Sequence, residues 1–244
     1  MLNIIKKSFL VFLFIGSLFA QEAKEVSKEE LSTISKLELI QKANIQVKKA
    51  FDYGSIYILA TVIQGTPQEL FLTKDKKVLL AGNAMNANTG EPFTIPADLS
   101  KVVGKEALIY GSGKDEYILF TDPECPYCKQ FESYFPQIEK NVKIRVFFYP
   151  LSFHENAKDL SLYYMSKKTN EEKINAMLNV TATSKEFIQR KIDEKTLANL
   201  EQSLEEQMVI AEELNVRGTP TLYNIKGKKV SWVELLYKNG IKVK

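Results

Sequence analysis

The chain has 244 residues and two cysteines, and it is long enough to bury a hydrophobic core without help from disulfide bonds. Its 33 basic and 30 acidic residues give a formal net charge of +3, and the charges are spread along the chain. This balance excludes the electrostatic footprint of a nucleic-acid-binding protein.

The first twenty residues have the pattern of a secretory signal peptide. Lys6 and Lys7 form a basic start, and the apolar run from Ser8 to Phe19 is too short to span a bilayer comfortably. Ala20 is the expected cleavage point, although Leu18 stands where a small residue is usual. An uncleaved membrane anchor is the alternative, which the short apolar run disfavours. We therefore predict export, with removal of residues 1–20, into an oxidising compartment.

Residues 21–97 are predicted to form a small α+β domain. Apolar side chains recur at helical spacing over 27–42, and a β-rich stretch follows. Its clearest part is a hairpin, in which strands at 70–73 and 78–81 flank a charged turn. Such a domain has a small core, and association with a second copy would stabilise it.

A short linker helix over 98–106, capped by Asp98, is predicted next. Strands are then expected at 107–110 and 117–121, the second one buried. The sequence Cys125-Pro126-Tyr127-Cys128 follows shortly after, at the start of a helical pattern. The cysteine pair therefore lies where a strand passes into a helix.

This position gives Cys125 a reactive setting. Pro126 suits the first helical position, because its φ is fixed and its missing N–H is not needed there. Cys125 then takes the cap position, beside unpaired backbone N–H groups and the positive end of the helix dipole, which favour the thiolate. Cys128 lies three residues later on the same helical face. The pair predicts disulfide exchange, in which the thiolate is the nucleophile.

Two other roles for the cysteines are weaker. A structural disulfide that closes this four-residue ring would add only roughly 2 kcal/mol in the chain-entropy model. A zinc site would need two further ligands, and the one histidine, His154, lies outside any ligand spacing.

The remaining elements are predicted from their apolar periodicity. The active helix is expected to run from Pro126 past Phe135, with Pro136 kinking or ending it. A strand over 142–148 and a mostly helical insert over 155–214 follow. The last helix of the insert has the clearest stripe, formed by Leu197, Leu200, Leu204, Met208, Ala211 and Leu214.

The sequence Gly218-Thr219-Pro220 precedes a predicted strand over 221–225. A proline at this point is a candidate for a cis peptide bond, because X–Pro bonds tolerate cis far better than others, and a trans-proline at a strand start is the alternative. A last strand over 228–230 and a closing helix from Ser231 complete the predicted fold.

These elements and motifs together resemble the thioredoxin fold, and in detail the periplasmic disulfide isomerases of the DsbC/DsbG type. The stretch Thr121-Asp122-Pro123-Glu124-Cys125-Pro126-Tyr127-Cys128-Lys129-Gln130-Phe131 is very similar to the DsbG-type active site. Gly218-Thr219-Pro220 is similar to the family's threonine before its cis-proline. The resemblance implies an α/β chain: an exported leader at 1–20, a dimerisation domain at 21–97, a linker helix at 98–106 and a thioredoxin-like catalytic domain at 107–244.

The resemblance also implies how the protein works. Cys125 attacks a wrong disulfide in an exported client protein, and Cys128 or a client thiol resolves the mixed disulfide. Thr219 and Pro220 bind client backbone as a short β-pairing, and we place Pro126 and Tyr127 with them as client-binding residues. No cofactor is expected beyond the redox-active disulfide of Cys125 and Cys128, and no metal. A homodimer is implied, kept reduced by an inner-membrane reductase of the DsbD type.

One position departs from related oxidases. Leu119 stands where thioredoxin and DsbA-type oxidases carry a buried carboxylate, so one proton acceptor for Cys128 is missing. Glu124 is an exposed substitute or simply a solvated residue. We predict a periplasmic thiol:disulfide isomerase or reductase. The alternatives are a dithiol oxidase and a dimeric chaperone whose client binding does not need the cysteines.

Overall fold

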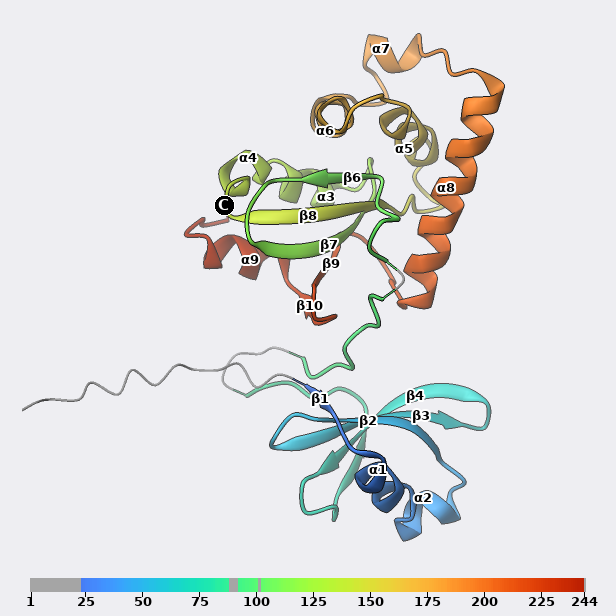
Figure 1. Cartoon of the computed structure of the whole chain (residues 1–244), viewed down its shortest axis with the longest axis vertical. Helices are drawn as coiled ribbons and strands as arrows, with labels where there is room; N and C mark the ends of the chain where they lie inside the picture. The colour runs from blue at the N-terminus through green and yellow to red at the C-terminus, as the bar shows by residue number, and fades with distance from the viewer. Residues whose placement is uncertain (1–22, 88–91, 101, 244) are drawn as a thin grey trace, which may run out of the picture. The chain divides into compact units, whose positions relative to one another are not determined.

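The computed structural model describes residues 23–87, 92–100 and 102–243, so the predicted signal peptide lies outside the described residues. The chain divides into two compact units, and the boundary falls between Ile95 and Pro96 (Figure 1). Within the described residues, no helix is long and apolar enough to cross a membrane.

The first unit is a five-stranded antiparallel sheet with two helices. The strands follow one another in the order β1-β2-β3-β4-β5. The elements are β1 (Lys24–Glu25), α1 (Lys28–Ser35), α2 (Glu38–Lys42), β2 (Gln46–Asp52), β3 (Ile56–Ile63), β4 (Thr66–Thr73) and β5 (Leu79–Ala81). The predicted hairpin is confirmed, because β4 pairs with β5 from Leu70 opposite Ala81 to Leu72 opposite Leu79.

The prediction of one helix over 27–42 is wrong in one respect, because the structure has two helices there, α1 and α2. Ser27 caps α1 by accepting a hydrogen bond from the Glu30 N–H at 3.2 Å. Leu37 then takes an extended conformation and starts α2. The break lets Ile34 and Ile40 both pack in the same core against the sheet.

The second unit is a five-stranded mixed sheet with helices on both faces (Figure 1). The strand order is β10-β9-β7-β8-β6, with β7 and β8 parallel and the other pairs antiparallel. Its strands are β6 (Leu108–Tyr110), β7 (Asp115–Thr121), β8 (Val142–Phe148), β9 (Thr221–Asn224) and β10 (Lys229–Val230). Its helices are α3 (Pro126–Glu132), α4 (Phe135–Ile138), α5 (Ala157–Met165), α6 (Asn170–Asn179), α7 (Lys185–Ile188), α8 (Glu194–Glu213) and α9 (Trp232–Lys238).

The central strand β7 shows why both faces are covered. Tyr117 and Leu119 pack in the core formed with α3 to α6 and α9, whereas Ile118 and Phe120 pack on the other face against the end of α8. Alternate residues of a strand point to opposite faces, so four consecutive apolar residues require two cores. The predicted helical insert is confirmed as α5 to α8.

The linker helix predicted over 98–106 is not formed. The described residues there make turns, in which the Val102 N–H donates to the Leu99 carbonyl at 3.1 Å and the Lys105 N–H to the Val102 carbonyl at 3.1 Å. Gly104 has a φ of 90°, which is outside helical geometry. Leu99 and Val102 are buried beside β7 and β8, so this segment belongs to the core of the second unit.

The active helix also ends earlier than predicted. α3 stops at Glu132, and Pro136 lies in the first turn of the separate helix α4, where its missing N–H costs nothing. The rings of Phe131 and Phe135 meet edge to face, with centroids 5.1 Å apart, in the same core.

Candidate active site

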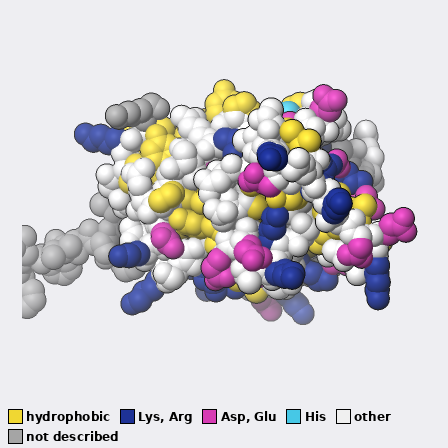
Figure 2. Space-filling model, turned by 90° about the horizontal axis from the view of Figure 1, so that it is seen from above, with side chains coloured by type: hydrophobic (Ala, Val, Ile, Leu, Met, Phe, Trp, Pro, Cys, Tyr) yellow, Lys and Arg dark blue, Asp and Glu magenta, His cyan; other side chains and the backbone are white. Residues whose placement is uncertain are grey.

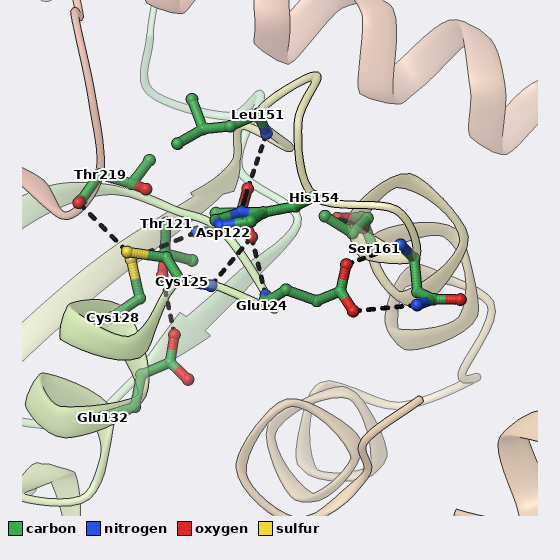
Figure 3. A network of polar contacts seen from close by, with 12 residues as sticks. Thr121, Asp122, Glu124, Cys125, Cys128, Glu132, Leu151, His154, Ser161 and Thr219 are labelled. Atoms are coloured by element: carbon green, nitrogen blue, oxygen red, sulfur yellow. Dashed lines mark hydrogen bonds and ion pairs between the residues drawn. The ribbon is translucent and has the colours of Figure 1, made fainter. Parts of the chain in front are cut away.

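Cys125 occupies the predicted position at the N-cap of α3. Its backbone is extended, with φ −70° and ψ 120°, and Pro126 opens the helix. The Cys125 N–H donates to the carbonyl and to the carboxylate Oδ1 of Asp122, both at 3.2 Å. The turn after β7 therefore fixes where the first sulfur lies (Figure 3).

The Thr219–Pro220 peptide bond is cis, and it lies at this sulfur. The Cys125 thiol donates to the Thr219 carbonyl oxygen at 3.4 Å, although the two residues are 94 positions apart in sequence. The pairing of β7 with β9 explains the contact, because Phe120 lies opposite Thr221 in the antiparallel register. The structure thus brings together the two motifs that the sequence singled out (Figure 3).

Cys128 is fully buried behind Cys125. The Asp122 N–H donates to its sulfur at 3.5 Å. Burial raises the pKa of the Cys128 thiol to about 12, although the hydroxyls of Thr121 and Thr219 and the Asp122 N–H act in the opposite direction. The Thr219 hydroxyl satisfies no full hydrogen-bond geometry with any described residue. Its influence on the Cys128 pKa is the smallest of the three.

Asp122 is the buried anchor of the site. Its Oδ1 accepts from the N–H groups of Glu124 at 2.7 Å and Cys125 at 3.2 Å, and its Oδ2 accepts from Leu151 N–H at 2.6 Å. His154 Nδ1 lies 2.9 Å from the same Oδ2. One carboxylate therefore connects the start of α3 to the loop between β8 and α5. The anchoring role of Asp122 was not predicted from the sequence, and His154 was considered there only as a metal ligand.

Glu124 is neither an exposed substitute acceptor nor a solvated residue. Its carboxylate accepts from the Asn156 backbone N–H at 2.6 Å and from the Asn156 side chain at 3.0 Å. Figure 3 shows the side chain pointing away from the sulfurs, toward α5. Its role is to hold the start of α5.

A second buried carboxylate, Glu132, was missed from the sequence. It lies on α3, one helical turn after Cys128, and its side chain is only 3% exposed. Its Oε1 accepts from the Thr121 hydroxyl at 2.8 Å, and its Oε2 lies 2.7 Å from Lys129 Nζ. Leu119 therefore does not leave the site without a buried carboxylate. The four-residue spacing from Cys128 was the signal available in the sequence.

The other two predicted client-binding residues, Pro126 and Tyr127, lie on the first turn of α3 and are exposed. The Tyr127 ring is 67% exposed, and Phe153, on the β8–α5 loop, is 76% exposed.

Among the described residues, no group of three or more His, Cys, Asp or Glu side chains could hold a metal ion. Figure 2 shows acidic and basic side chains interspersed on the face that it presents.

A family model described as "Thioredoxin-like domain" matches residues 105–234, which is more than half of the chain. The chain belongs to the thioredoxin-like domain family. This match covers both cysteines, the cis-proline and the helical insert of the thioredoxin-like domain.

No curated protein matches the chain in sequence. Among solved structures, DsbG of Helicobacter pylori is 13% identical, with a TM-score of 0.40, and the match covers 80% of this chain and 98% of that one. A disulfide interchange protein from Neisseria gonorrhoeae is 23% identical, with a TM-score of 0.38 and coverage of 55% and 93%. BdbD from Bacillus subtilis is 18% identical, with a TM-score of 0.41 and coverage of 59% and 94%.

This thioredoxin-like domain holds one thiol, that of Cys125, 5% exposed and against a backbone carbonyl, and a second thiol that is fully buried.

Proposed function

We propose that the protein is a periplasmic thiol:disulfide isomerase or reductase that acts on other exported proteins. One observation carries the proposal: Cys125 Sγ lies 3.4 Å from the carbonyl oxygen of Thr219, beside the cis peptide, with Cys128 buried behind it. Cys125 is 5% exposed and Cys128 is not exposed at all, so a client disulfide would meet the Cys125 sulfur first and leave Cys128 as the second thiol.

The reaction begins when the Cys125 thiolate attacks one sulfur of a client disulfide. A Cys125–client disulfide forms, the client disulfide breaks, and the second client sulfur leaves as a thiolate that takes a proton. In isomerisation, a client thiolate attacks the bound client sulfur and releases Cys125, with no net transfer of electrons. In reduction, Cys128 attacks Cys125 Sγ, so that the client gains two electrons and the Cys125–Cys128 disulfide forms.

Client backbone would bind along the segment that leads into β9. The Thr219 hydroxyl is buried without a partner among the described residues, and its carbonyl faces the cysteine. An extended client segment can pair with such an edge through main-chain hydrogen bonds. The exposed rings of Tyr127 and Phe153 would add apolar contact on the surface of the same unit.

The partners belong to the same proposal. A dithiol reductase of the DsbD type in the inner membrane would return two electrons to the Cys125–Cys128 disulfide. The first unit would join two copies of the chain. Light scattering of the purified protein tests the dimer, and a mass of one chain at micromolar concentration would reject it.

The experiment that tests the function is insulin reduction by cysteine variants. We expect Cys125→Ser to abolish the activity, because the attacking sulfur is lost. Cys128→Ser should leave Cys125 linked to client protein, because the buried thiol that resolves the mixed disulfide is lost. Full activity in Cys125→Ser would overturn the proposal.

Two further measurements separate the alternatives. Equilibration with glutathione distinguishes an isomerase or reductase from a dithiol oxidase, because a strong oxidant is held preferentially in its reduced form. Suppression of client aggregation by the Cys125→Ser, Cys128→Ser double variant would support a chaperone that does not need the cysteines. Loss of suppression in that variant would reject it.

A further inference from the structure

The chain has one histidine, and it contacts the carboxylate that anchors the active site. His154 lies on the loop between β8 and α5, and its Nδ1 is 2.9 Å from Oδ2 of Asp122 (Figure 3). The Asp122 side chain is fully buried, whereas that of His154 is 18% exposed. A buried acid is therefore paired with a base that can exchange protons with solvent.

Asp122 is joined to both cysteines by hydrogen bonds. Its Oδ1 accepts from the Cys125 N–H at 3.2 Å, and its own N–H donates to the Cys128 sulfur at 3.5 Å. The sulfur of Cys125 is only three covalent bonds from the nitrogen that the carboxylate contacts. A negative charge so close disfavours a second one, so the Asp122 carboxylate opposes ionisation of the Cys125 thiol. The site thus contains a charge that acts against its own nucleophile.

His154 can remove this opposition without moving. A carboxylate only accepts hydrogen bonds, so Nδ1 carries a hydrogen in both the neutral and the protonated ring. The contact with Asp122 is therefore the same in the two forms. They differ in charge, because a second proton, on Nε2, makes the ring a cation. Protonation changes the electrostatics of the site and keeps its geometry.

We propose that His154 is a positioning residue for the Cys125 thiolate: its protonated ring offsets the charge of Asp122, so that a larger fraction of Cys125 is ionised. The inference rests on the proposed function, in which the Cys125 thiolate attacks the client. When the thiol ionises, its S–H bond breaks, the electron pair stays on sulfur and the proton passes to water, while His154 keeps its own proton. As the pH rises and His154 becomes neutral, the Asp122 charge loses its counter-charge.

Backbone contacts hold His154 in place in both charge states. The Leu151 N–H donates to Asp122 Oδ2 at 2.6 Å, and the His154 N–H donates to the Leu151 carbonyl at 2.9 Å. The Phe153 ring also meets the imidazole edge to face, with centroids 4.5 Å apart. Replacement of the imidazole leaves the two backbone contacts of the loop intact, so a variant at this position tests the charge of the ring.

The other titratable groups near His154 include two further carboxylates. Glu155 follows it on the same loop and is exposed, and Glu124, on the turn before α3, accepts from the Asn156 N–H at 2.6 Å and side chain at 3.0 Å. The groups on α5 have partners of their own: Lys158 pairs with Glu201, Asp159 pairs with Arg190, and the Tyr164 hydroxyl donates to the Val180 carbonyl at 2.7 Å. A proton on His154 therefore adds a positive charge to an acidic neighbourhood.

The test measures how fast iodoacetamide alkylates Cys125 in the reduced chain, freed of any purification tag so that His154 remains the one histidine. The rate follows the thiolate fraction of Cys125. We would record it between about pH 4 and pH 9, a range that includes the ordinary titration of histidine near 6.5. Proton NMR of the single imidazole follows the titration of His154 under the same conditions.

His154→Gln keeps a hydrogen-bond donor for Asp122 but cannot become charged. We expect it to slow alkylation by about 3- to 10-fold at pH values below the His154 titration, and to leave the rate unchanged above it. His154→Arg carries a permanent charge and should restore the rate at acidic pH. Ser152→Gln, exposed on the same loop, is the control and should match the unaltered chain throughout.

The reciprocal effect needs no change at His154. If its proton favours the Cys125 thiolate, the thiolate must favour that proton equally. Cys125→Ser should therefore lower the titration midpoint of His154 by about 0.5–1 pH unit, which corresponds to the same 3- to 10-fold effect. An unchanged midpoint would overturn the proposal.

Equal alkylation rates for His154→Gln and the unaltered chain below the His154 titration would also overturn it. A loss that His154→Arg does not restore, or one that persists above the titration, would have the same consequence, because either means that the ring acts through its shape. None of these rates depends on client turnover. Failure of the unaltered chain to reduce insulin would instead reject the proposed function, so the two failures are distinguishable.

Discussion

Both cysteines are buried, but Cys125 keeps 5% of its surface exposed and Cys128 none. Cys128 is completely buried, and burial raises its pKa to about 12. We expect iodoacetamide to label Cys125 and to spare Cys128 in the folded protein near neutral pH, because alkylation requires an accessible thiolate. Mass spectrometry of the digested protein measures this, and labelling in urea, where both should react, is the control. Comparable labelling of both thiols in the folded state would contradict the burial described above.

Glu132 makes the folded state less stable as the pH rises. Its pKa is raised in the folded chain, so stability is lost between the unfolded pKa, about 4.5, and the higher folded value. Glu132→Gln removes this loss. We expect the free energy of unfolding of the variant to exceed that of the unaltered chain at pH 8 and to match it below the unfolded pKa.

Urea denaturation at several pH values checks this expectation. The exposed Glu205→Gln change should show no such pH dependence. A variant that is less stable than the unaltered chain at pH 8 would mean that the ion pair with Lys129 outweighs the cost of burial.

Asp122 should be among the most sensitive polar positions. Asp122→Ala leaves the N–H groups of Glu124 and Leu151, and His154, without their acceptor, whereas the Cys125 N–H keeps the Asp122 backbone carbonyl. An unsatisfied buried donor costs about 1–3 kcal/mol, so we expect a loss of roughly 3 kcal/mol or more in urea denaturation. Asp115→Ala, at the exposed start of β7, the strand that precedes Asp122, is the matched control and should cost about 1 kcal/mol or less. Similar losses in the two variants would contradict the anchoring role.

The helices, strands and turns that were predicted correctly are those whose formation depends on neighbouring residues in the sequence. The setting of Cys125 follows from a proline at the first position of α3, and the hairpin of β4 and β5 from a charged turn between apolar runs. The cis bond before Pro220 was a prediction from the Thr-Pro pair, and the structure contains it.

Tertiary packing decided the elements that the sequence did not predict. Leu99 and Val102 have helical spacing, but burial against β7 and β8 fixes them in turns. α3 breaks before Phe135 so that its ring and that of Phe131 share one core. Glu132 was missed because a charged residue on a helix is usually solvated, and periodicity does not show which one is buried.

The division of the whole molecule leads to a prediction about fragments. The second unit begins at Pro96, whereas the family model begins at residue 105. A fragment of residues 96–244 should keep the core that Leu99 and Val102 complete. A fragment of residues 105–244 lacks both and should be less stable by about 3 kcal/mol or more, since each buried aliphatic side chain contributes roughly 1.5–3 kcal/mol. Equal denaturation midpoints would show that these residues do not support the fold.

The register between β7 and β9 has a consequence for how the insert can vary. The distance from the Cys125 sulfur to the Thr219 carbonyl depends on two strands paired side by side, with Leu119 opposite Leu222 and Phe120 opposite Thr221. The length of chain between these strands does not enter that geometry. Lineages or designers could lengthen or exchange the loop between α7 and α8, which follows the buried Phe187, while both reactive groups stay in place. Insertion of one residue after Phe120 or before Thr221 would separate them at once.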